Sequence, residues 1–172
     1  MELHEISAHL EIQQVVARYS RGVDRCDAEL MKSAFHPGAI QEFGAYVGDA
    51  AEFCDMIVPN VAATSLMTLH GNMNHSIELE ENGEVAHGEL YNISTVWREQ
   101  ADGTPMVDTW WGRYLDRYER RNGEWRIAHR AIVHELTRTQ PLGELMPMEG
   151  REHLRQGSAD RGVRKPLGLR EA

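Results

Sequence analysis

The sequence predicts an α+β fold in which helices come first and a meander of long antiparallel strands follows. Apolar residues recur at helical spacing through the first third of the chain, and an extended pattern replaces that period after residue 65. Turn sequences that end in glycine, at 81–83, 102–103 and 122–123, separate the extended segments. Because helices and strands do not alternate, the order favours the α+β class over a parallel α/β class.

Residues 5–25 are expected to form the first helix. Their apolar side chains fall on one stripe, which a helix would bury against the rest of the protein. The residues of this stripe are Leu10, Ile12, Val15, Val16, Tyr19 and Val23.

Shorter elements are expected between this helix and the strands. Asp27 is placed to cap a second helix that ends at the His-Pro-Gly sequence of 36–38. Residues 39–48 resemble a short strand or hairpin. Asp49 is placed to cap a third helix, which Pro59 should end or kink.

The remaining strands should form one strongly curved, mostly antiparallel sheet. Long strands around helices leave a cone-shaped cavity, so we expect a single cone-shaped α+β domain over residues 1–140. Residues 141–172 are rich in Gly, Arg and Pro and are expected to form a tail, partly disordered or closing a pocket or a subunit interface. The expected strands are 65–80, 84–99, 106–120 and 124–138.

Composition excludes several classes of protein. The 172 residues carry a net charge of −9, which argues against nucleic-acid or anionic-membrane partners. No signal peptide or membrane-spanning run is visible, and two isolated thiols, Cys26 and Cys54, suit a reducing cytoplasm. Aromatic residues on both faces of the expected sheet favour a homo-oligomer formed through the sheet.

Two segments carry a resemblance to a known family. They are RYSRGVDRCDAELMKSAFHPGA at 18–39 and GRYLDRYERRNGEWRIAHR at 112–130. With the order of the elements, they resemble the nuclear transport factor 2-like (SnoaL-like) superfamily over about residues 8–140. The branch it resembles holds scytalone dehydratase, bile-acid 7α-dehydratase and hexachlorocyclohexane dehydrochlorinase. The resemblance implies a cofactor-free lyase and a trimer, with a dimer as the alternative.

The resemblance also implies four catalytic residues. Asp24 falls on the aspartate at the end of the first helix, and His70 on the histidine of the strand after the third helix. Tyr19 matches the tyrosine five residues before the aspartate in the bile-acid enzyme. Arg130 matches an active-site arginine of the dehydrochlorinase.

Elementary chemistry supports the Asp24–His70 pair. A carboxylate in the last turn of a helix meets the negative end of the helix dipole, so it usually needs a partner. Strict strand alternation, however, puts His70 on the face opposite His75. Either Gly71 marks a bulge or both faces are buried, and Asn72 or Asn74 would share the face of His70.

Four further residues are candidates for binding the substrate. Tyr46 and Trp111 are expected in a pocket wall and Asn74 beside His70. His134, or His87 as the alternative, is expected near the place of a second catalytic histidine. We expect no metal site, because the histidines form no H-x-H or H-E-x-x-H pattern.

The function predicted from these residues is a dehydratase-type lyase without a cofactor. His70 would remove a proton, Asp24 would orient the imidazole, and Tyr19 or Arg130 would assist the leaving hydroxide or stabilise an oxyanion. A Trp-, Tyr- and Met-rich wall suits a hydroxylated aromatic, phenolic or polycyclic substrate such as a steroid. The alternatives are a lyase of lignin-derived diarylpropanes that releases formaldehyde, a ketosteroid-type isomerase, and a non-catalytic binding module.

Overall fold

The computed structural model describes residues 2–143 of the chain. Within these residues there are three helices and six strands, and the long strands follow the helices as the sequence predicts. They are α1 (Leu3–Asp24), α2 (Ala28–Lys32), β1 (Phe35–Phe43), β2 (Tyr46–Asp49), α3 (Ala50–Thr64), β3 (Met67–Leu79), β4 (Val85–Glu99), β5 (Pro105–Arg121) and β6 (Glu124–Pro141).

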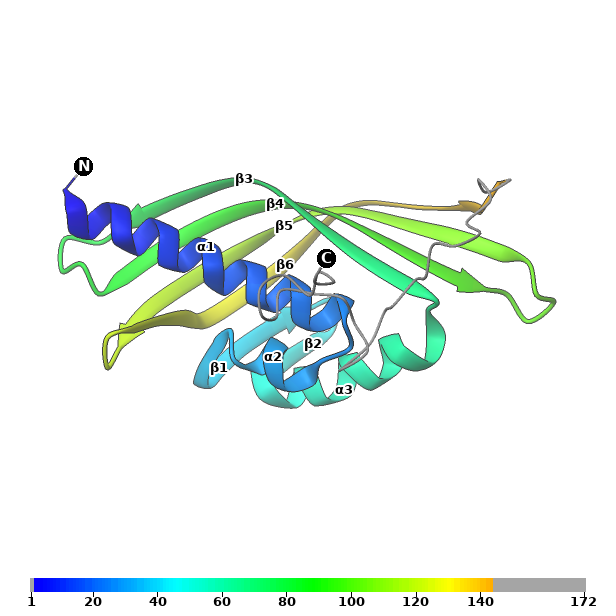
Figure 1. Cartoon of the computed structure of the whole chain (residues 1–172), viewed down its shortest axis with the longest axis horizontal. Coiled ribbons are helices and arrows are strands. Elements are labelled where there is room, and N and C mark those ends of the chain that lie inside the picture. Colours follow the sequence, from blue (N-terminus) through cyan, green and yellow to red (C-terminus); the bar gives the residue numbers. More distant parts are fainter. Residues whose placement is uncertain (1, 144–172) are drawn as a thin grey trace, which may run out of the picture.

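The six strands form one curved sheet that does not close into a barrel (Figure 1). Their order is β2-β1-β6-β5-β4-β3, and every neighbouring pair is antiparallel except β1 and β6, which are parallel. Helix α1 lies along the sheet against β3 and β6, while α3 packs on β1 and α2. This arrangement confirms the predicted cone-shaped α+β fold.

Helix α1 forms where the sequence places an amphipathic stripe. Its buried residues include Ile12, Val15, Val16, Tyr19 and Val23, all at helical spacing. A Cβ on Gly22 would lie 2.5 Å from the backbone nitrogen of Met31, so glycine allows α2 to pack directly on α1. Asp27 caps α2 as predicted, since its carboxylate accepts the Leu30 N–H at 2.9 Å.

The His-Pro-Gly sequence does not end a helix, which corrects the expectation for 36–38. Helix α2 stops at Lys32 and β1 begins at Phe35. Phe35 is buried and pairs with Ile127 of β6, and the ring Nε2 of His36 donates to the Glu119 carbonyl at 2.8 Å. Long-range packing therefore determines this segment, which a local pattern does not reveal.

Pro59 lies inside α3 and does not end it. Proline removes one backbone hydrogen bond. On either side of Pro59, however, Val58 is buried in the core and Val61 packs against it, which holds the helix together as far as Thr64. Asp49 caps α3 as predicted, accepting the Ala51 N–H at 2.8 Å.

A bulge in β3 resolves the conflict between the faces of His70 and His75. The register with β4 pairs His70 with Ser94 and Asn72 with Asn92, then shifts before His75 pairs with Leu90. One extra residue in β3 thus returns both histidines to the inner face of the sheet. The bulge follows Asn72, whereas the sequence suggested Gly71.

Within residues 2–143, no helix is long and apolar enough to cross a membrane. Strand β6 extends to Pro141, one residue beyond the predicted domain. The rest of the predicted tail, 144–172, lies outside the described residues.

Candidate active site

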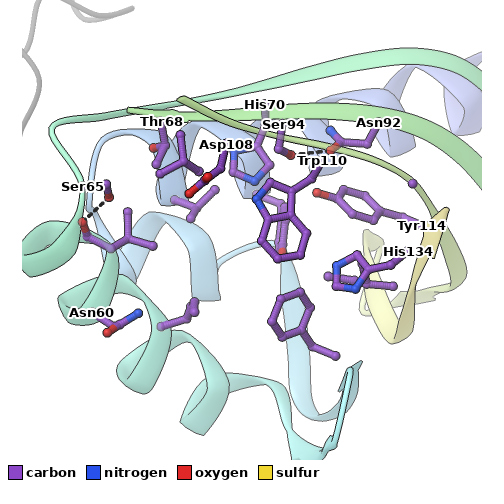
Figure 2. A pocket seen from close by; sticks show the side chains of 18 of the residues that line it. Asn60, Ser65, Thr68, His70, Asn92, Ser94, Asp108, Trp110, Tyr114 and His134 are labelled. Carbon is purple, nitrogen blue, oxygen red and sulfur yellow. Dashed lines mark hydrogen bonds between the residues drawn. The ribbon is translucent and has the colours of Figure 1, made fainter. Parts of the chain in front are cut away.

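A cavity of about 290 Å³ opens between the inner face of the sheet and helices α1 and α3. Its apolar wall comes from both layers and includes Val23, Phe43, Phe53, Ile57 and Ile132. Figure 2 shows His70 of β3, Trp110 and Tyr114 of β5, and His134 of β6 projecting into the same space. The cavity therefore combines a mostly apolar lining with a few polar groups, as small-molecule sites usually do.

The structure brings Asp24 and His70 together. The His70 ring Nδ1 lies 2.6 Å from Asp24 Oδ1, and the His70 backbone N–H donates to Asp24 Oδ2 at 2.9 Å. Because a carboxylate only accepts, Nδ1 must carry the proton, and Nε2 on the opposite side of the ring is left free to accept one. His70 lines the cavity whereas Asp24 lies behind it, so a bound ligand would meet the imidazole first.

The end of α1 explains why Asp24 sits where it does. It is the last residue of the helix and only 6% of it is exposed. The helix dipole disfavours a negative charge at this end. Two hydrogen bonds from His70 offset that cost, so β3 supplies the partner that the sequence predicted for Asp24.

Tyr19 lines the cavity, but Arg130 does not. The guanidinium of Arg130 lies between two rings, 4.1 Å from the centroid of Tyr19 and 4.3 Å from that of Tyr114. It forms a bidentate ion pair with Asp116, at 2.7 and 2.6 Å, and neither side chain has any exposed surface. Arg130 thus supports the cavity wall from behind the tyrosines.

These contacts fix the protonation of the tyrosines and the arginine. Burial raises the pKa of Tyr19 to about 12, and it also raises the pKa of Tyr114, so both hydroxyls stay protonated at neutral pH. Burial alone would lower the pKa of Arg130, but the charge and hydrogen bonds of Asp116 outweigh it, and the arginine stays charged. The site therefore offers neutral hydroxyl donors next to the imidazole of His70.

The predicted substrate-binding residues divide into two groups. Trp111 and His134 line the cavity. The centroid of the His134 ring lies 4.9 Å from that of Trp110, with the rings tilted, and 5.2 Å from that of Phe43, with the rings edge to face. Tyr46 and Asn74 are not in the lining: the Tyr46 hydroxyl donates to the Asp49 carbonyl at 2.8 Å, and Asn74 is exposed at the bulge.

The sequence missed a chain of polar side chains beside His70. Ser94 donates to Asn92 at 2.5 Å (Figure 2), and the Asn92 amide donates to Asn72 at 3.1 Å. Asn72 in turn bonds to Ser20 of α1. The hairpin turn at 81–83 alone would pair His70 with Thr95 and Asn72 with Ile93. The bulge after Asn72 shifts this register by one residue and places Ser94 and Asn92 there instead, so no local signal identifies them.

The sequence also missed a pair of charges in the cavity wall. Arg98 Nε donates to Asp108 Oδ2 at 2.6 Å, and both residues line the cavity. Arg98 is the main reason that the pKa of Asp108 is lowered. Among residues 2–143, no three His, Cys, Asp or Glu side chains gather in a way that could hold a metal ion.

A six-stranded curved sheet packed around helices, with a cavity between them, is the architecture of the nuclear transport factor 2-like class of α+β proteins. The SnoaL-like domain family matches residues 4–131. The chain belongs to this family, as the resemblance predicted. No curated protein matched the chain by sequence.

Solved structures agree on the fold. A scytalone dehydratase-like protein from Novosphingobium aromaticivorans is 15% identical, with a TM-score of 0.72, covering 89% of this chain and 100% of that one. A hexachlorocyclohexane dehydrochlorinase is 18% identical, with a TM-score of 0.71 and coverages of 87% and 99%. A protein of unknown function from Mycobacterium tuberculosis is 23% identical, with a TM-score of 0.65 and coverages of 76% and 73%. At these identities the likeness establishes the fold alone.

Proposed function

We propose that this protein is a cofactor-independent lyase that eliminates water from a hydroxylated aromatic substrate. The observation that carries the proposal is the 2.6 Å contact between His70 Nδ1 and Asp24 Oδ1, with the imidazole in the cavity wall. This contact fixes the tautomer in which Nε2 is a base, and a binding protein has no need of it.

His70, Tyr19 and Asp24 can account for every proton transfer in the proposed elimination. Nε2 of His70 takes a proton from carbon, and the electron pair of that C–H bond forms the new double bond. The hydroxyl on the neighbouring carbon leaves as water, after the Tyr19 hydroxyl gives it a proton. The imidazolium then returns its proton to Tyr19. Asp24 stabilises the imidazolium throughout, as the carboxylate does in a hydrolytic triad.

Arg130 has a different role in this proposal from the one the resemblance implies. Its guanidinium is sealed behind Tyr19 and Tyr114 and neutralised by Asp116, so it does not reach a ligand in the cavity. We propose that Arg130 positions the two tyrosines, and that Tyr19 assists the leaving group.

The cavity favours a compact aromatic substrate. About 290 Å³ lies just below the roughly 300–1,000 Å³ typical of ligand pockets. Trp110 and Phe43, which pack on His134, offer flat faces to an aromatic ring. A one- or two-ring phenolic compound, such as a lignin-derived diarylpropane, therefore fits better than a steroid.

A substrate panel tests the proposed reaction. We expect the purified protein, without added cofactor, to convert lignin-type diaryl propanediols or related phenolic alcohols into products lighter by one water. Mass spectrometry would also detect an additional loss of formaldehyde. In that reaction the electron pair of the broken C–C bond forms the double bond and the proton removed comes from the terminal hydroxyl, so this product would identify a deformylating lyase in place of the simple elimination. Isomerised products of unchanged mass would contradict the proposal in favour of an isomerase, and tight binding without conversion would favour a binding module.

We also propose that the protein forms a homo-oligomer through the outer face of the sheet. Large apolar side chains remain exposed there, including Leu69, Tyr91 and Leu136, at 55%, 45% and 60%. Sedimentation velocity should therefore show a species larger than one chain, with a trimer expected. Leu136→Glu should shift the population toward monomer, because a charge would be buried in the interface. A monomeric wild-type protein at micromolar concentration would contradict this proposal.

A further inference from the structure

Two bridges, not one, join α1 to β3. The first is the pair Asp24–His70, at 2.6 and 2.9 Å. The second is the pair Ser20–Asn72: the Asn72 amide donates to Ser20 Oγ at 2.9 Å, and Ser20 Oγ lies 3.2 Å from Asn72 Oδ1. Both bridges link the same helix to the same strand.

The spacing of the bridges follows from the geometry of the two elements. Ser20 and Asp24 are four residues apart on one helix face, a rise of about 6 Å. His70 and Asn72 are two residues apart on one strand face, a rise of about 6.6 Å. Because these distances nearly match, the two bridges lie side by side between α1 and β3.

The second bridge also ties β3 to the next strand. Asn92 donates to Asn72 Oδ1 at 3.1 Å. Its amide nitrogen also lies 3.4 Å from the carbonyl of Gly71, the residue between His70 and Asn72. Ser94, which pairs with His70 across the sheet, donates to Asn92 at 2.5 Å. Side chains of both α1 and β4 are thus hydrogen-bonded to the segment of β3 that carries the imidazole.

The position of the bulge gives the second bridge its importance. The register of β3 shifts between Asn72 and His75, so the strand bends just beyond His70. On the side of β3 that faces α1, the Ser20–Asn72 bridge is the contact next to the bulge. It adds a second link to α1 at the end of the regular segment that carries His70.

We propose that Ser20 and Asn72 are positioning residues that hold the imidazole of His70 with Nδ1 on Asp24 and Nε2 in the cavity. Neither acts on the substrate in this role, since neither lines the cavity. The proposal extends the proposed function, because it explains how the base keeps its orientation. It also makes a structural claim that holds without any substrate.

Nuclear magnetic resonance of the protein without ligand tests that claim. A proton shared between an imidazole and a carboxylate resonates far downfield, so the His70 Nδ1 proton should be visible there. In Ser20→Ala and Asn72→Ala, we expect this resonance to move upfield and to exchange faster with water. Ser7→Ala on α1 and Ser76→Ala on β3 are matched controls at exposed positions and should leave it unchanged.

Kinetics and a double-mutant cycle complete the test. Each variant should lower kcat by about 5- to 50-fold with little change in KM, because a small misplacement of the base weakens the transition state most. The double variant should be no worse than the more affected single variant, since both remove one bridge. Melting temperatures measured in parallel separate this effect from unfolding.

The outcomes distinguish the two proposals. An unchanged His70 resonance in both single variants would overturn the positioning role, whatever the rates show. A shifted resonance with unchanged kcat on a confirmed substrate would also overturn it. If the wild-type protein converts no substrate, the lyase proposal fails, while the resonance still decides whether the second bridge holds His70.

Discussion

Replacing His70 by alanine is expected to lower kcat by about 10³-fold or more while the protein stays folded. A general base at this position contributes roughly 10²- to 10⁴-fold, and no other described side chain in the cavity pairs with a carboxylate in the same way. Asp24→Asn should lower kcat by about 10²- to 10⁴-fold, because an amide no longer enforces the tautomer with Nε2 free. Initial rates on the substrate identified by the panel measure both effects.

A matched control accompanies these variants. His87 lies on β4 and pairs with Glu80 at 3.0 Å on the surface, with about half of its side chain exposed. His87→Ala should keep the wild-type rate. If Asp24→Asn also kept a near wild-type rate, Asp24 would not orient His70, and the elimination mechanism would need another base.

Breaking the ion pair of Arg130 and Asp116 should produce the largest loss of stability. Both side chains are fully buried, and the Tyr118 hydroxyl also donates to Asp116, at 2.5 Å. Arg130→Met leaves a buried carboxylate without its cation, which costs about 3–5 kcal/mol of the free energy of unfolding. Urea denaturation measures this loss, which is a large part of the roughly 5–15 kcal/mol typical of a domain.

The control for this prediction is a more exposed set of ion pairs on β5, the strand that carries Asp116. Arg113 pairs with Glu135 and Glu89 at the surface of β5, so Arg113→Met should change the free energy of unfolding by less than about 1 kcal/mol. The double variant Arg130→Met with Asp116→Leu should recover part of the lost stability, because no charge then remains buried. If Arg130→Met kept its stability and lost only activity, the arginine would act on the ligand, as the family resemblance implies.

The sequence predicted most elements because their signals are local. The stripe of α1, the caps Asp27 and Asp49, and the turns of the β3–β6 meander all depend on neighbouring residues, and the structure has each of them. The start of β1 was wrong because Phe35 becomes a strand residue only through Ile127, which is distant in the sequence. Local propensity carries no information about such a partner.

The site was predictable only as far as the resemblance and single residues allowed. Asp24 and His70 were identified from the resemblance, and the position of a carboxylate at a helix C-terminus supported the need for a partner. Asn92 and Ser94 were missed because the bulge after Asn72 shifts the register by one residue, and no local pattern shows it. The sequence around Arg130 does not distinguish an arginine that contacts a ligand from one that pairs with a buried carboxylate. Its ion pair with Asp116 therefore could not be predicted.

The most direct measurement is the fate of one hydrogen atom of the substrate. A substrate carrying deuterium on the carbon next to the hydroxyl-bearing carbon should react more slowly than the ordinary compound, and its product should lack that deuterium. We expect the wild-type protein and His87→Ala to release the deuterium to water together with the loss of hydroxyl, and His70→Ala to release none. Loss of hydroxyl with the deuterium retained, or release of deuterium by His70→Ala at the wild-type rate, would contradict the role of His70 as the base.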